Sequence, residues 1–123
     1  MSTRLSGKKV AILATDGFEH SELHEPMKAL KDQGADVELV SIKEGEITSW
    51  KDKDWGDKIK VDRLVKDTSA DKFDALVLPG GVINPDLLRN DEGAVDFVKG
   101  FFKEGKQKPV AAICHGPWMF NLF

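Results

Sequence analysis

Three short apolar segments, each followed directly by a glycine-containing turn, restrict the folds open to this chain more than any other feature. They are residues 9–14, 73–78 and 109–113. After the first, residues 23–30 place apolar side chains on one helical face, Gly34 ends that helix, and residues 37–42 form another strand. A strand, a helix and a strand in this order predict a parallel βαβ unit with a right-handed crossover.

The remaining segments extend this pattern into a layered domain. Residues 46–50 and 59–61 are weaker strand candidates around a polar stretch, and they predict a small excursion from the main sheet. Asp91 is suited to cap a further helix, which Gly105 closes. The apolar positions of that helix are Val95, Phe97, Val98, Phe101 and Phe102. We therefore expect a single α/β domain over residues 1–123, a three-layer α/β/α sandwich around a mostly parallel sheet.

Composition excludes several classes of protein. Hydrophobic residues make up 41% and charged residues 32% of the 123 residues, a balance typical of a soluble globular protein. The net charge of -3 favours neither nucleic acid nor an anionic membrane as a partner. The sequence shows neither a signal peptide nor an apolar run of membrane-spanning length. Its one cysteine leaves no internal disulfide, so we expect a cytoplasmic location.

Chemically distinctive residues follow three of the predicted strands. Residues 16–20 follow the first strand, residues 79–81 follow the strand that begins at Phe73, and residues 114–116 follow the last. Parallel strands bring their carboxyl ends to one edge of a sheet, which is where open α/β sheets bind ligands. We therefore expect these three segments to form one site.

Cys114 has the surroundings of a nucleophile elbow. Small residues stand two positions before and two after it, as a tight turn between a strand and a helix requires. Pro117 suits the first turn of the following helix, whose N-terminus favours the thiolate form of the cysteine. An isolated cysteine beside a histidine is more often a buried structural residue, but this context favours a nucleophile.

The two other segments allow two interpretations each. Glu19 is either a carboxylate that interacts with a helix dipole or a group that reaches Cys114, as a hydrogen-bond donor or as a base. Gly80 and Gly81 either supply a positive φ or direct their amides into an oxyanion hole together with the amide of His115. The residues alone leave these alternatives open.

Two pairs of residues carry weaker signals. His20 and His24 have a spacing that binds metal on a helix, but they lack the zinc-protease pattern, so we interpret them as two solvated histidines and expect no metal site. Trp50 and Trp55 flank a charged loop and are interpreted as part of a protomer interface or of a cleft rim.

These motifs together resemble the PfpI family of the class I glutamine amidotransferase-like superfamily. The matching segments are residues 16–19 with 22–23, 75–81, 84–86, 55–57 and 112–117. The resemblance implies a flavodoxin-like sandwich in which Cys114 is the nucleophile, Glu19 its hydrogen-bond partner and His115 the adjacent base. It also implies an acid at Asp86 from the neighbouring protomer of a homodimer or larger homo-oligomer, and an oxyanion hole that includes Gly81.

The resemblance further implies a cysteine-dependent hydrolase or lyase that needs no cofactor. Family members have been assigned glyoxalase, protein deglycase and peptidase activities. We expect action on reactive dicarbonyls or on their early protein adducts, so the substrate is a small carbonyl compound or a glycated protein. The alternatives are an intracellular cysteine peptidase and a non-enzymatic redox-sensing or chaperone-like stress protein.

The end of the chain departs from the family pattern. Residues 118–123 are almost wholly apolar and stop without a polar cap. Because members of the family continue past the elbow helix, we expect this chain to be a fragment that lacks C-terminal elements and whose own activity is reduced or lost.

Overall fold

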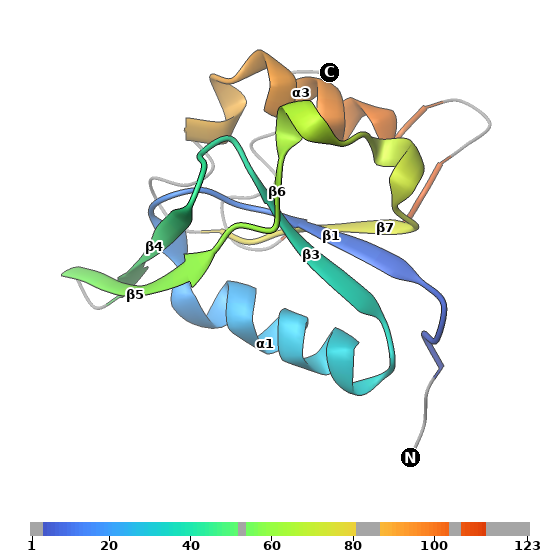
Figure 1. Ribbon diagram of the computed structural model, residues 1–123, viewed down its shortest axis with the longest axis horizontal. Coiled ribbons are helices and arrows are strands. Elements are labelled where there is room, and N and C mark those ends of the chain that lie inside the picture. The colour runs from blue at the N-terminus through green and yellow to red at the C-terminus, as the bar shows by residue number, and fades with distance from the viewer. Residues whose placement is uncertain (1–3, 52–53, 81–86, 104–106, 113–123) are drawn as a thin grey trace.

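A five-stranded parallel sheet forms the centre of the computed structural model, which describes residues 4–51, 54–80, 87–103 and 107–112. Its order is β6-β3-β1-β7-β8, and every neighbouring pair is parallel (Figure 1). The strands are β1 (Lys9–Leu13), β3 (Asp36–Ser41), β6 (Arg63–Leu64), β7 (Ala75–Leu78) and β8 (Val110–Ala112). The predicted parallel βαβ unit is therefore confirmed.

Helices cover both faces of this sheet. Helix α1 (His20–Asp32) lies on one face, and helix α3 (Glu92–Gly100) lies on the other with the short helices η1 (Val65–Asp67) and η2 (Ala70–Lys72) (Figure 1). Strand residues alternate between two hydrophobic cores, because successive side chains of a strand point to opposite faces. On β1, Ala11 and Leu13 belong to the core under α3, whereas Val10 and Ile12 belong to the core under α1. This arrangement confirms the predicted three-layer sandwich.

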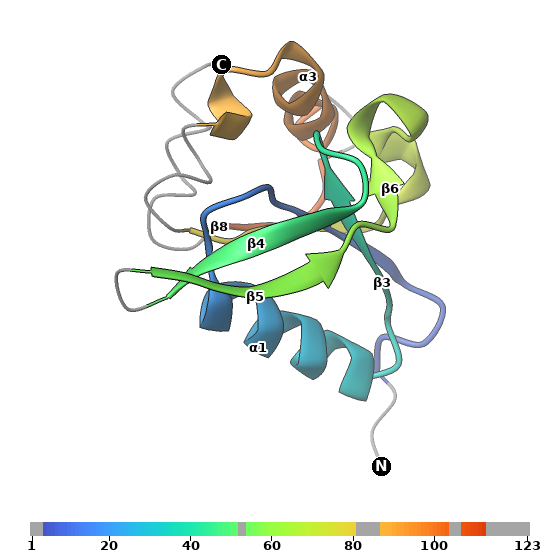
Figure 2. The same cartoon turned by 60° about the vertical axis from the view of Figure 1, so that its left-hand side comes forward.

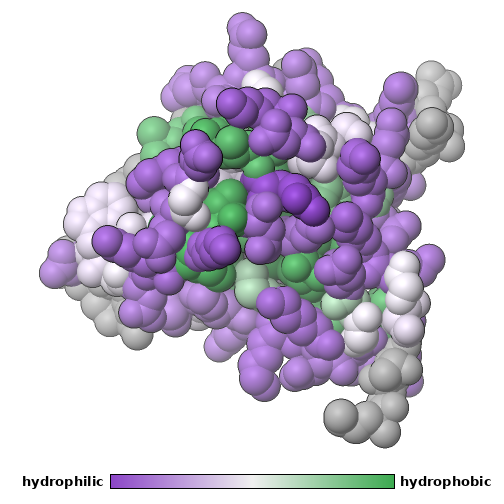
Figure 3. Space-filling view, viewed as in Figure 1, coloured by the Kyte–Doolittle hydropathy of each residue, from purple (hydrophilic) through white to green (hydrophobic). Residues whose placement is uncertain are grey.

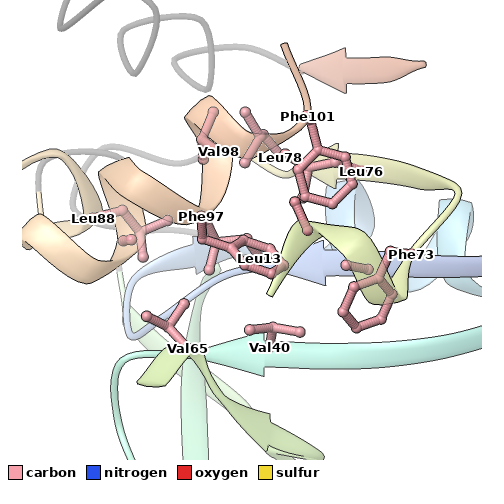
Figure 4. Close-up of a cluster of buried hydrophobic side chains, with 13 residues drawn as sticks. Leu13, Val40, Val65, Phe73, Leu76, Leu78, Leu88, Phe97, Val98 and Phe101 are labelled. Atoms are coloured by element: carbon pink, nitrogen blue, oxygen red, sulfur yellow. The ribbon is translucent and has the colours of Figure 1, made fainter. Parts of the chain in front are cut away.

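The core under α3 is rich in aromatic rings. Phe97 stacks edge to face on Phe73 at 5.9 Å and on Phe101 at 5.2 Å between ring centroids. Leu13 and Val40 from the sheet lie beneath them (Figure 4). Polar and charged side chains cover most of the face in Figure 3, and hydrophobic groups show only in gaps between them.

A second, three-stranded sheet stands beside the first. Strand β2 (Phe18–Glu19) pairs in parallel with β4 (Glu46–Lys51), which pairs antiparallel with β5 (Asp54–Lys60). The hairpin lies along α1 (Figure 2), where Ile47 is fully buried. The predicted excursion from the main sheet is thus confirmed, although the strand at Phe18 was not predicted.

Several predicted details differ from the structure. Ala29, predicted on the apolar face of α1, is exposed, as is Phe102, which lies beyond the end of α3 with 41% of its surface accessible. The strand predicted from Phe73 begins at Ala75, because residues 70–72 form a 3₁₀ turn. Gly34 follows α1 with a φ of 91°, as a helix stop requires. Gly105 lies outside the described residues.

In the part of the chain that the structure describes, no helix is long and apolar enough to cross a membrane.

The cap of α3 provides a test of how this layer is stabilised. The Asp91 carboxylate accepts a hydrogen bond of 2.9 Å from the Ala94 amide, as the sequence predicts. We expect Asp91→Ala to lower the free energy of unfolding by about 1 kcal/mol, because it removes this acceptor. Asp91→Asn keeps an acceptor and serves as the control in urea denaturation. Equal losses in both variants would contradict the capping role.

Candidate active site

The order of the strands locates a crevice at one edge of the main sheet. Strand β3 lies on one side of β1 and β7 lies on the other, so the connections leave β1 in opposite directions. Ligands of open α/β sheets bind at such a point, outside the carboxyl ends of the strands. Glu19 follows β1 here and Gly80 follows β7, and their backbones meet through a hydrogen bond. The expectation that these two segments share one edge is confirmed.

Strand β8 directs the chain toward the same edge. It runs parallel to β7 with Leu78 opposite Ala112, and Cys114 comes two residues after Ala112 in the sequence. Four of the predicted site residues lie outside the described residues: Cys114, His115, Gly81 and Asp86. Their roles stay predictions, and the described part of the site consists of Gly80 and the first turn of α1.

The first turn of α1 binds both backbone groups of Gly80. The Glu19 amide donates a hydrogen bond of 3.2 Å to the Gly80 carbonyl, and the Gly80 amide donates one of 2.9 Å to Oε1 of Glu22. Gly80 is buried, so Glu22 satisfies an amide that is shielded from water. This bond occupies the Gly80 N–H in the structure, and the role of Gly80 in an oxyanion hole stays a prediction.

The two glutamates of this turn differ in what their side chains contact. Glu22 reaches across to the end of β7, whereas Oε1 of Glu19 lies 3.4 Å from the hydroxyl of its neighbour Ser21. Sequence reasoning selected Glu19 and missed Glu22. The signal that could have identified Glu22 was its position three residues after the helix N-cap Glu19, because an acid at that position is the partner in a capping box. Here that acid binds Gly80 instead of the N-cap amide.

The turn before Glu19 is held by strand β4. Gly17 adopts a φ of 84° and donates its amide to the Thr48 carbonyl at 2.9 Å. One oxygen of Asp16 accepts the Thr48 amide at 2.9 Å, and the other forms an ion pair with Lys43 at 2.9 Å. The turn that presents Glu19 and Glu22 is therefore fixed on both sides, by the hairpin and by the main sheet.

His20 and His24 are not the two solvated histidines that the sequence predicts. Both are partly buried, their ring centroids are 4.4 Å apart, and His20 Nδ1 lies 3.5 Å from Oδ2 of Asp57. Burial lowers the pKa of His24, the neighbouring His20 lowers it further, and Asp57 opposes the shift. The reason for the difference is tertiary, since Asp57 of β5 lies beside His20, and the ring of His24 is close to those of Phe18 and His20. Among the described residues, no group of three or more potential ligands is placed to hold a metal ion.

Comparison with known proteins gives a consistent family assignment. Residues 8–121 match the model of the DJ-1/PfpI family. The chain is 42% identical to Deglycase PfpI of Pyrococcus furiosus, over 89% of this chain and 61% of that protein. It is 43% identical to YraA of Bacillus subtilis, which is provisionally named a cysteine protease, over 89% of this chain and 62% of that protein. The chain thus spans somewhat over three fifths of these relatives.

A solved structure with the same architecture is a two-domain protein of Anabaena variabilis that contains a DJ-1/ThiJ/PfpI-like domain and a ferritin-like domain. The TM-score is 0.82 at 33% sequence identity, over 92% of this chain and 31% of that chain. The match confirms the flavodoxin-like fold expected from the sequence motifs.

The lowered pKa of His24 gives a testable dependence of stability on pH. Below the ordinary pKa of 6.5 the unfolded chain binds more protons than the folded one. The stability contributed by neutral His24 is therefore complete above that pH and is lost as the pH falls toward the lowered pKa. We expect His24→Gln to flatten the fall in the free energy of unfolding between about pH 7.5 and 5.5. An unchanged slope in urea denaturation would contradict this assignment.

Proposed function

The chain belongs to the DJ-1/PfpI family. From that premise we propose that the protein is a cysteine-dependent enzyme that acts on reactive dicarbonyls or on their early protein adducts. The observation that carries this proposal is the attachment of the α1 turn to the end of β7 at the strand-order switch. Strand β8, which leads to Cys114, ends at the same edge. The name Deglycase, given to several relatives, supports this substrate class.

In the proposed reaction the Cys114 thiolate attacks an electrophilic carbonyl carbon. A new carbon–sulfur bond forms, and the carbonyl electron pair moves to the oxygen, which the amides of Gly81 and His115 stabilise. His115 then transfers a proton at the adduct, and Asp86 of a neighbouring protomer orients it. A proton shift between the two former carbonyl carbons converts the adduct to a thioester, and water then hydrolyses the carbon–sulfur bond, which releases a hydroxy acid and regenerates the thiol. No cofactor takes part in these steps.

We assign the carboxylate next to the nucleophile to Glu22 in preference to Glu19. Glu22 already reaches the backbone at the end of β7, which neighbours β8 in the sheet. Glu19 is instead paired in register with Trp50 of β4 in the second sheet, and its carboxylate contacts Ser21. A carboxyl group at the end of β7, the strand that neighbours β8, is suited to donate a hydrogen bond to a thiolate or to accept its proton.

Peptide hydrolysis is the second candidate, because the relative YraA carries a protease name. Both candidates use the same nucleophile and oxyanion stabilisation, and they differ in the bond that is broken. The cytoplasmic location, the homo-oligomer and a redox-sensing or chaperone-like role remain predictions from the sequence.

Substitution of the nucleophile tests the proposed function. We expect Cys114→Ser to abolish consumption of methylglyoxal, free and as a protein adduct, because a hydroxyl is a far weaker nucleophile than a thiolate at neutral pH. Product identification by NMR distinguishes the two reactions. Free methylglyoxal yields lactate, whereas a protein adduct yields regenerated amino groups on the protein. The proposal fails if the Cys114→Ser protein turns over either substrate at the original rate.

The assignment of Glu22 has its own test. Glu22→Gln keeps an oxygen that can accept from Gly80 but removes the ionisable group. We expect it to lower kcat at least tenfold more than Glu19→Gln does, in line with the roughly 10²- to 10⁴-fold contribution of proton transfer by a side chain. Thermal melts of both variants control for folding. The opposite ranking would return the role to Glu19.

A further inference from the structure

Glu19, Trp50 and Trp55 form a row across the second sheet. Glu19 is paired with Trp50 between β2 and β4, and Trp50 is paired with Trp55 between β4 and β5. Residues opposite one another on neighbouring strands carry their side chains on the same face. The adjacent pair, Phe18 and Ser49, is fully buried against the body of the protein, so the row lies on the outer face.

An irregularity in the hairpin aims Trp55 at this face. Thr48 pairs with Lys58, but Trp50, two residues further on, pairs with Trp55, three residues back. Strand β5 therefore contains one extra residue, and a bulge of this kind redirects a side chain. It allows Asp57 to face His20 of α1 while Trp55 turns outward and packs on Trp50.

The two indoles meet at a right angle. Their ring centroids are 5.1 Å apart with an interplanar angle of 89°, and 51% of the surface of Trp55 is exposed. In this geometry the edge of one ring contacts the face of the other, which leaves indole surface open to solvent. An exposed indole face attracts cations, and a planar guanidinium stacks on it better than an ammonium group does.

A carboxylate at the inner end of the row favours the same kind of ligand. Glu19 provides it, whereas Asp54, which precedes Trp55 in β5, accepts the Trp55 amide at 2.7 Å and is paired with Lys51. The inner end is also tied to the crevice, because the Glu19 amide binds the Gly80 carbonyl. Strands lie about 4.8 Å apart, so the row extends roughly 10 Å from the crevice, a distance that an extended peptide covers in about three residues.

We propose that the row Glu19–Trp50–Trp55 binds the guanidinium group of an arginine side chain near the modified residue of a polypeptide substrate. This inference rests on the proposed function and narrows it, because a subsite that extends roughly 10 Å from the crevice serves adducts on polypeptides and offers no contact to a free dicarbonyl in the crevice. Arginine-containing protein adducts are then the preferred substrates.

Peptide adducts that differ in one group test the subsite. The substrates are two peptides whose cysteine carries a methylglyoxal hemithioacetal, with arginine or its uncharged analogue citrulline three residues before the cysteine. We expect a kcat/KM about two- to fivefold higher for the arginine peptide, expressed in KM, as a single exposed cation–π contact provides. Trp55→Leu is expected to remove this preference, Trp55→Phe to keep part of it, and Lys60→Gln, at the far end of β5, to keep it fully.

A binding measurement separates this inference from the proposed function. Titration with the two unmodified peptides, followed by the indole N–H resonances of Trp50 and Trp55, requires no turnover. We expect the arginine peptide alone to shift both resonances, and Glu19→Gln to weaken its binding. If the protein turns over neither peptide adduct but the arginine peptide alone still shifts the two resonances, only the proposed function is overturned. Equal responses to both peptides, or a preference that survives Trp55→Leu, would overturn the subsite.

Discussion

Two hydrogen bonds at Gly80 join the parts of this protein that have to act together. Gly80 follows β7 of the main sheet and binds Glu19 and Glu22 at the start of α1. Strand β2, which contains Glu19, in turn pairs with β4 of the hairpin. A hydrogen bond within a protein contributes about 0.5–1.5 kcal/mol, and a buried amide deprived of one carries a desolvation penalty as well. Glu22, together with the Glu19 amide, therefore holds the first turn of α1 at the end of β7.

The fold was predictable where hydrophobic periodicity is long and turn chemistry is unambiguous. The strand predicted at residues 37–42 is found at residues 36–41, and Gly34 and Asp91 end and begin helices as expected. Short elements were not predicted, because a strand of two residues such as Phe18–Glu19 is too short to show a hydrophobic periodicity. Phe102 was assigned to an apolar face because its spacing fits the helix, but α3 ends at Gly100 and the next turn faces solvent.

The site was predictable only as far as topology determines it. Parallel strands necessarily bring residues 16–20 and 79–80 to one edge, so the crevice followed from strand order. Which of two glutamates points into it depends on side-chain direction, which spacing alone does not decide. The same limit explains the histidine pair, since no pattern within α1 indicates that Asp57 of β5 lies beside His20 or that the two imidazole rings are close together.

The extra residue in β5 has opposite consequences on the two faces of the hairpin. Without it, strict alternation would place Asp57 and Trp55 on one face, and either the carboxylate would leave His20 or the indole would enter the space against α1. The bulge serves both needs, because the inner face contributes a charge to the histidine pair while the outer face gains an aromatic surface. Since the turn of Glu19 and Glu22 lies between these faces, its inner side is suited to chemistry at the sheet edge and its outer side to recognition.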